Sequence, residues 1–143
     1  MIASLVEWLQ ASGLSAWASG GAVYPVANIV HLLGLVLLVG SIGILDLRLL
    51  GAWPALPRDA LQRALTPLGV AGLLLLAVSG SVLFAADAES VAGSTVFRWK
   101  LAVIGLALAN AALFRRVGGR VLAAISLAAW LVAAGLGRMI AYS

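Results

Sequence analysis

Two long stretches without a charged side chain constrain this chain more than any other feature. Residues 22–45 and residues 64–86 contain no Asp, Glu, Lys or Arg. Each stretch is longer than the roughly 20 residues that an α-helix needs to cross the hydrocarbon core of a bilayer. Only 10% of the 143 residues are charged, whereas about a quarter of the residues in a soluble domain are charged. The sequence therefore predicts a membrane protein.

Two shorter uncharged runs, residues 101–114 and 121–137, extend the pattern. Neither reaches a full span by itself, so each helix must carry polar residues into the edge of the membrane. We expect the third helix to begin near Val96 and the fourth to continue through Arg138. The prediction is an all-α fold, a single membrane domain over residues 1–143, with a bundle of four transmembrane helices near 22–48, 64–86, 96–115 and 119–141.

The segment before the first span has apolar residues on one helical face only. Ile2, Leu5, Val6 and Leu9 fall on one face of a helix, which is typical of an amphipathic helix that lies in the membrane interface. We expect such a helix within residues 1–21. No basic residue precedes it, and a cleaved signal peptide begins with a basic region, so we expect Met1 to begin the mature protein.

Basic residues cluster in two of the three connections between spans. Three arginines follow the first span and three follow the third, whereas the connection after the second span carries Asp87 and Glu89. Because cytoplasmic loops are enriched in Lys and Arg, the two basic connections are expected in the cytoplasm and both termini outside it. The arginines are Arg48, Arg58, Arg63, Arg115, Arg116 and Arg120.

Composition excludes several classes of site. The chain has no Cys and one His, which excludes disulfide scaffolds, iron–sulfur clusters, thiolate zinc sites and metal sites made only of histidines. The pI of about 10.8 is explained by the two basic connections, so we expect a lipid bilayer and no nucleic acid as partner.

One set of polar residues is expected to converge at the outer end of the bundle. His31 lies too deep in the first span to reach the surface, and Tyr24 and Asn28 share its helical face. Ionisable groups within a span usually face the bundle interior or a cavity. The candidate site residues are His31, Tyr24, Asn28, Arg98, Lys100, Arg138 and Tyr142.

Several of these residues also have an ordinary structural interpretation. Arg98 and Arg138 can reach the headgroups from a helix end, and so can Lys100. Of Arg98 and Lys100, which point in opposite directions, we expect the deeper Lys100 to face the bundle. His31 is either a neutral hydrogen-bonding core residue or a metal ligand.

Two further residues have two interpretations each. Asp46 either pairs with an arginine of the second basic connection, which we favour, or belongs to a proton path. Trp130 falls in the middle of its span. It is either lipid-facing or the wall of a pocket.

The stretches Val30-His31-Leu32-Leu33-Gly34 and Phe97-Arg98-Trp99-Lys100-Leu101 resemble motifs of the HemJ-type membrane protoporphyrinogen oxidases and their copper-resistance D-like relatives. The resemblance implies a helical bundle with haem b, His31 as axial ligand and Lys100 as its partner in the site. Copper handling is disfavoured because copper transport uses soft Met, Cys or several His ligands, and the chain has no Cys, one His and only Met1 and Met139. Together with Leu45-Asp46-Leu47-Arg48-Leu49-Leu50-Gly51 and Gly137-Arg138-Met139-Ile140-Ala141-Tyr142, these motifs look still more like those of an uncharacterised family of bacterial integral membrane proteins.

The leading hypothesis is therefore a haem b protein of the bacterial inner membrane. If it is an enzyme, it would be a haem-dependent oxidoreductase, with a quinone or a porphyrin as candidate partner. One His per chain leaves the second axial position open or filled by another residue or a neighbouring chain, so a homo-oligomer is also considered. The alternatives are a non-enzymatic membrane subunit that acts through a partner and, third, a small transport or proton-conducting element.

The predicted topology can be tested directly because the chain has no native cysteine. Single cysteines introduced at Ser90 and at Gly118 should react with a membrane-impermeant maleimide from opposite sides of the membrane. Labelling of both positions from the same side would contradict the topology.

Overall fold

The chain folds into helices joined by short connections, in a computed structural model that describes residues 1–142. Four of the helices are long and apolar enough to cross a membrane, which confirms the predicted all-α membrane fold. The elements are α1 (Ile2–Ala11), α2 (Leu14–Ser19), α3 (Val23–Leu50), α4 (Arg58–Ala86), α5 (Ala88–Gly93), α6 (Thr95–Val117), α7 (Arg120–Met139) and a 3-10 turn (Ile140–Tyr142).

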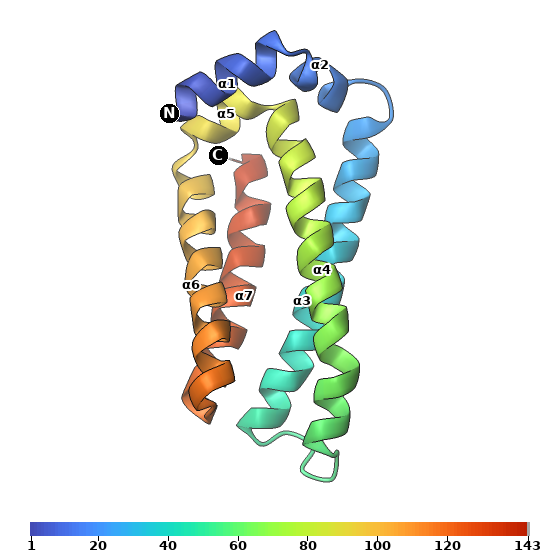
Figure 1. Ribbon diagram of the computed structural model, residues 1–143, viewed down its shortest axis with the longest axis vertical. Coiled ribbons are helices and arrows are strands. Elements are labelled where there is room, and N and C mark those ends of the chain that lie inside the picture. The colour runs from blue at the N-terminus through green and yellow to red at the C-terminus, as the bar shows by residue number, and fades with distance from the viewer. Residues whose placement is uncertain (143) are drawn as a thin grey trace.

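The four long helices stand side by side, and the short helices α1, α2 and α5 lie across one end of them (Figure 1). We call this the terminal end, because the N-terminus and the C-terminal residues lie there. The connections 51–57 and 118–119 lie at the opposite end, which we call the loop end. Helix α3 is central, since it packs along α4 on one side and against α7 on the other, while α7 also packs along α6.

Three details differ from the sequence prediction. Helix α4 begins at Arg58 rather than near residue 64, because an uncharged run marks only the apolar part of a helix that continues past the membrane edge. Pro67, the fourth residue of the predicted span 64–86, therefore lies well inside the helix. The segments 14–19 and 88–93 form the helices α2 and α5, which are too short to show a periodic apolar pattern.

Glycines bring α3 and α4 into close contact. A Cβ atom added to Gly72 would lie 2.6 Å from the backbone nitrogen of Leu38 and 2.7 Å from the carbonyl oxygen of Gly34. One added to Gly34 would lie 2.9 Å from the carbonyl oxygen of Gly72. Small residues allow such close packing in membranes, where apolar side chains gain little by leaving lipid. The α3–α4 pair therefore depends on Gly34 and Gly72.

The middle of the bundle is apolar. Leu38, Ala107, Ala129 and Trp130 form its buried cluster, and partly buried side chains of α4 pack against it. Trp130 is only 8% exposed, so it belongs to this core and does not face lipid. We call these four residues the central apolar layer.

The outer surface is unusually extensive and apolar. The accessible surface is 8731 Å², whereas a soluble monomer of 14.6 kDa would expose about 6,900 Å². Large apolar side chains such as Leu32, Val36, Leu74 and Val78 are exposed along the spans. Exposed apolar surface of this extent is typical of a protein that contacts lipid or other proteins, and the length and composition of the four helices are consistent with a bilayer.

The close approach of α3 and α4 predicts the effect of one methyl group. Gly72→Ala should lower the free energy of unfolding by about 1–3 kcal/mol, because the new Cβ meets backbone atoms that cannot move aside. Gly40→Ala is the matched control, because a Cβ atom added at Gly40 would have no neighbouring atom within 4 Å. Denaturation in mixed detergent micelles measures both, and equal stability of the two variants would contradict this account of the packing.

Candidate functional site

The centre of the candidate site is a contact between α3 and α4 in the half of the bundle nearer the terminal end. The Nδ1 atom of His31 lies 2.9 Å from the hydroxyl oxygen of Ser79. Ser79 is 3% exposed, and its hydroxyl donates a hydrogen bond to the carbonyl oxygen of Leu75 at 2.6 Å. His31 is half-buried. The only histidine of the chain is thus held from the neighbouring helix.

This pair of hydrogen bonds determines which nitrogen of the imidazole carries hydrogen. A serine hydroxyl has one hydrogen to donate, and that of Ser79 is directed to Leu75. With that hydrogen directed to Leu75, the oxygen of Ser79 accepts from His31 in the tautomer that carries hydrogen on Nδ1. In the neutral ring the Nε2 atom then keeps its lone pair. This is the arrangement of a histidine that binds a metal through Nε2 and is oriented by a second residue.

A glycine makes room for the ring. A Cβ atom on Gly80 would lie 3.3 Å from the Cε1 atom of His31 and 3.7 Å from its Nδ1 atom. The absence of a side chain at Gly80 therefore lets the imidazole lie against α4 beside Ser79. The Ser79-Gly80 pair provides both the hydrogen-bond acceptor and the space for His31.

Lys100 approaches the same region from α6. It is half-buried, and its Nζ atom lies 3.2 Å from where a Cβ of Gly137 would be, so the side chain runs across the surface of α7. Its charge is close enough to interact electrostatically with His31. Arg98, by contrast, is exposed, and its guanidinium lies 3.5 Å from the carbonyl oxygen of Ala92. Lys100 rather than Arg98 thus faces the bundle, as we expected from its greater depth.

The remaining candidates lie away from His31. Tyr24 and Asn28 are exposed, so the expected polar stripe along α3 does not surround the histidine. Arg138 donates a hydrogen bond to the Tyr142 hydroxyl at 3.0 Å and stacks over its ring at 5.3 Å from the centroid. Both side chains are exposed. His31 and Lys100 are thus half-buried and within electrostatic range of each other, while these four residues lie at the surface.

Sequence reasoning missed Ser79, Gly80 and Gly137. Periodicity identifies which residues share a face of one helix, but it does not give the alignment of two helices. The alignment of α3 with α4 could nevertheless have been predicted, because the two helices are antiparallel and joined by the short connection 51–57. Residues at equal distances from the middle of that connection must lie at similar depths, and this places His31 within one helical turn of Ser79.

A second polar cluster lies near the loop end. Asp46 is 6% exposed and lies near the side chain of Ser126. The expected pairing of Asp46 with an arginine is not found in the described part of the chain. Arg120 instead donates to the carbonyl oxygen of Leu50 at 2.5 Å. It thereby supplies a donor to the last turn of α3, whose carbonyl groups have no partner within the helix. Asn110 donates to the carbonyl oxygen of Leu122 at 2.9 Å.

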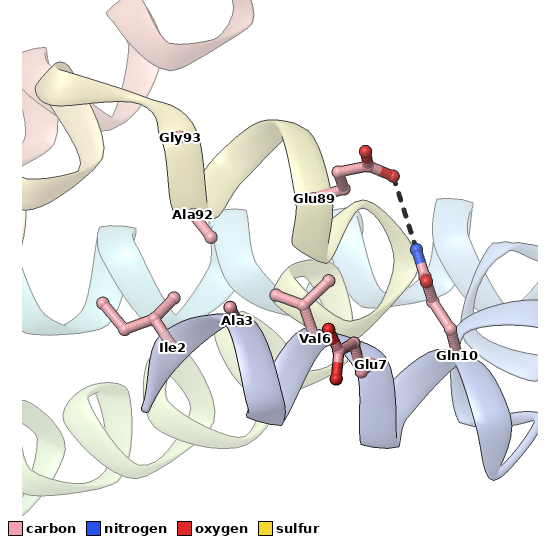
Figure 2. A pocket seen from close by; sticks show the side chains of 8 residues that line it. All are labelled: Ile2, Ala3, Val6, Glu7, Gln10, Glu89, Ala92 and Gly93. Carbon is pink, nitrogen blue, oxygen red and sulfur yellow. Dashed lines mark hydrogen bonds between the residues drawn. The ribbon is translucent and has the colours of Figure 1, made fainter.

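A shallow pocket of about 390 Å³ lies at the terminal end, between α1 and α5 (Figure 2). Its floor is formed by apolar side chains that include Val6 and Ala92, and its rim carries Glu7 and Glu89. Gln10 bridges the two helices by donating to Glu89 at 3.4 Å. The pocket is separate from His31 and Lys100, which do not line it.

Within residues 1–142, His, Cys, Asp and Glu side chains do not form a group of three or more that could hold a metal ion. A metal at His31 would therefore have to be bound as part of a larger cofactor or with other ligands. No family model, curated protein or solved structure matches the chain.

The buried position of Ser79 predicts that removing its hydroxyl destabilises the protein more than removing the hydroxyl of Ser81. Ser79→Ala should lower the free energy of unfolding by about 1–3 kcal/mol, because it leaves the Nδ1 hydrogen of His31 without an acceptor. Ser81→Ala is the matched control, since the exposed Ser81 hydroxyl bonds only to the carbonyl oxygen of Ala77 in its own helix. Denaturation measurements that give the same small loss for both variants would show that the interhelical hydrogen bond does not form.

Proposed function

We propose that the chain is a membrane haem b protein in which Nε2 of His31 ligates the iron. The observation that carries the proposal is the hydrogen bond between His31 and Ser79. It leaves the lone pair on Nε2, and axial histidines of haem proteins bind the iron through such a nitrogen while the other ring nitrogen is held by a protein group.

Two further features of the bundle fit haem b. The missing side chain at Gly80 leaves space for the imidazole against α4, and the hydrogen bond to Ser79 orients the ring. Lys100 places a cation near His31, where it is suited to a propionate group of the porphyrin. The resemblance of the segments around His31 and Lys100 to HemJ-type oxidases agrees with the same assignment. The haem would supply one-electron or oxygen chemistry, while the chain supplies ligation and access.

We extend the proposal to the orientation of the chain in the membrane and to the number of copies at the site. We place the chain in the inner membrane of a bacterium with the loop end in the cytoplasm, because six arginines follow the first and third spans. His31 and Lys100 then lie in the outer half. With one histidine per chain, coordination of the iron by two histidines would require a second copy, and other residues or an open position are compatible with a single copy.

The proposal predicts that haem binding depends on His31. The purified protein, expressed with a haem precursor, should show a Soret band that shifts on reduction, and His31→Ala should lose this band while still inserting into the membrane. Insertion is retained because one neutral residue changes the hydropathy of a long span little. Asn28→Ala is the matched control, since Asn28 is exposed one turn away on the same helix.

Two results would contradict the proposal. One is a His31→Ala variant with normal haem content. The other is a wild-type protein that takes up no haem during expression or in titration with haemin. The hydrogen bond between His31 and Ser79 would then serve only to anchor α3 to α4, as in a non-enzymatic membrane subunit.

A further inference from the structure

Asp46 is a buried acidic residue that the proposed haem site does not use. It lies in the last part of α3, one turn before Leu50, and packs against α7. It is 6% exposed, and its Oδ2 atom is enclosed without a hydrogen-bond partner. The polar side chain beside it is Ser126 of α7.

Two arginines of the loop end are bonded to other groups. Arg48, on the same helix as Asp46, donates to the carbonyl oxygens of Leu56 and Pro54 at 2.8 and 3.0 Å. Arg120, on α7, donates to the carbonyl oxygen of Leu50. The remaining charged residues of this end are exposed, on α4 and α6: Arg58, Asp59, Arg63, Arg115 and Arg116. The described side chains thus supply no cation to neutralise a carboxylate at Asp46.

An ionised carboxylate in this position would be costly. An unpaired charge within a membrane protein loses its hydration without compensation, and a carboxylate needs several donors for its two oxygens. A metal cation would need more oxygen ligands than Asp46 and Ser126 offer, because Ca²⁺ and Mg²⁺ take about six or more. The Asn110 amide nitrogen is directed to Leu122. A proton, in contrast, needs only one carboxyl oxygen.

We propose that Asp46 is a reversible proton-binding site, at which the carboxylic acid is held between α3 and α7. The proton lies on one carboxyl oxygen, with the Ser126 side chain nearby, and the other oxygen becomes a neutral carbonyl oxygen. A buried carbonyl oxygen without a partner is tolerated better than an unpaired carboxylate oxygen. The central apolar layer separates this site from His31, so it is independent of the proposed haem site.

The proposal is tested with two carbodiimides on the protein in lipid vesicles. Dicyclohexylcarbodiimide partitions into the membrane and reacts with protonated carboxyl groups, whereas a water-soluble carbodiimide with an added amine reacts with exposed ones. The hydrophobic reagent should label Asp46, and raising the pH from mildly acidic to alkaline should reduce this labelling several-fold. The water-soluble reagent should label the other four acidic residues, which are exposed, and spare Asp46: Glu7, Asp59, Asp87 and Glu89. Mass spectrometry of peptides assigns each adduct.

Infrared spectroscopy provides a second measurement that does not depend on access of a reagent. The wild-type protein should show the carbonyl band of a protonated carboxylic acid, and the band should be missing from Asp46→Asn, which keeps the volume and hydrogen-bonding capacity but cannot titrate. The absence of this band from the wild type across the pH range would overturn the proposal. So would protection from the hydrophobic reagent by sodium, compared with choline at the same pH, because it would identify Asp46 as a cation ligand.

Discussion

The close approach of α3 and α4 is the contact on which the rest of the structure depends. Their backbones meet at Gly34 and Gly72, where a single Cβ atom would collide with the opposite helix. The contacts of Gly34 with Leu76, of Gly72 with Leu38, of Gly69 with Ser41 and of His31 with Ser79 all share one antiparallel alignment. The glycines therefore determine not only how near the helices lie but also which residue of α4 faces the histidine. A shift of one residue along either helix would remove the acceptor from Nδ1 of His31.

The bundle holds two polar regions that are separated by the central apolar layer. His31, Ser79 and Lys100 lie toward the terminal end, and Asp46, Ser126 and Asn110 lie toward the loop end. Between them, Leu38, Trp130 and two alanines fill the space. A continuous path for protons or ions would need polar groups or water through this layer, so the arrangement favours two local sites over a conducting pathway along the bundle axis. It also means that a substitution in one region is expected to leave the chemistry of the other unchanged.

The sequence predicted the number and order of the spans because charge and apolar length depend on each helix separately. The same reasoning failed where the answer depended on how two helices are aligned. Tyr24 and Asn28 share a face with His31 but turn away from its partner, which is Ser79 of α4. Asp46 was expected to pair with an arginine, but Arg120 binds the end of α3 instead. Periodicity predicts faces, whereas contacts between helices also require their alignment, which here is determined by glycine contacts and by the length of the connection 51–57.

The central claim is that Ser79 fixes the hydrogen of His31 on Nδ1 and leaves Nε2 free. Because the chain has a single histidine, the ¹⁵N spectrum of protein labelled only at the imidazole nitrogens contains one pair of signals and needs no assignment by mutation. In cofactor-free protein in lipid bilayers, solid-state NMR should show a proton bonded to Nδ1 and the strongly downfield shift of an unprotonated nitrogen at Nε2. A proton on Nε2, with Nδ1 bare, would contradict the hydrogen-bond arrangement and remove the main support for a ligand at this histidine.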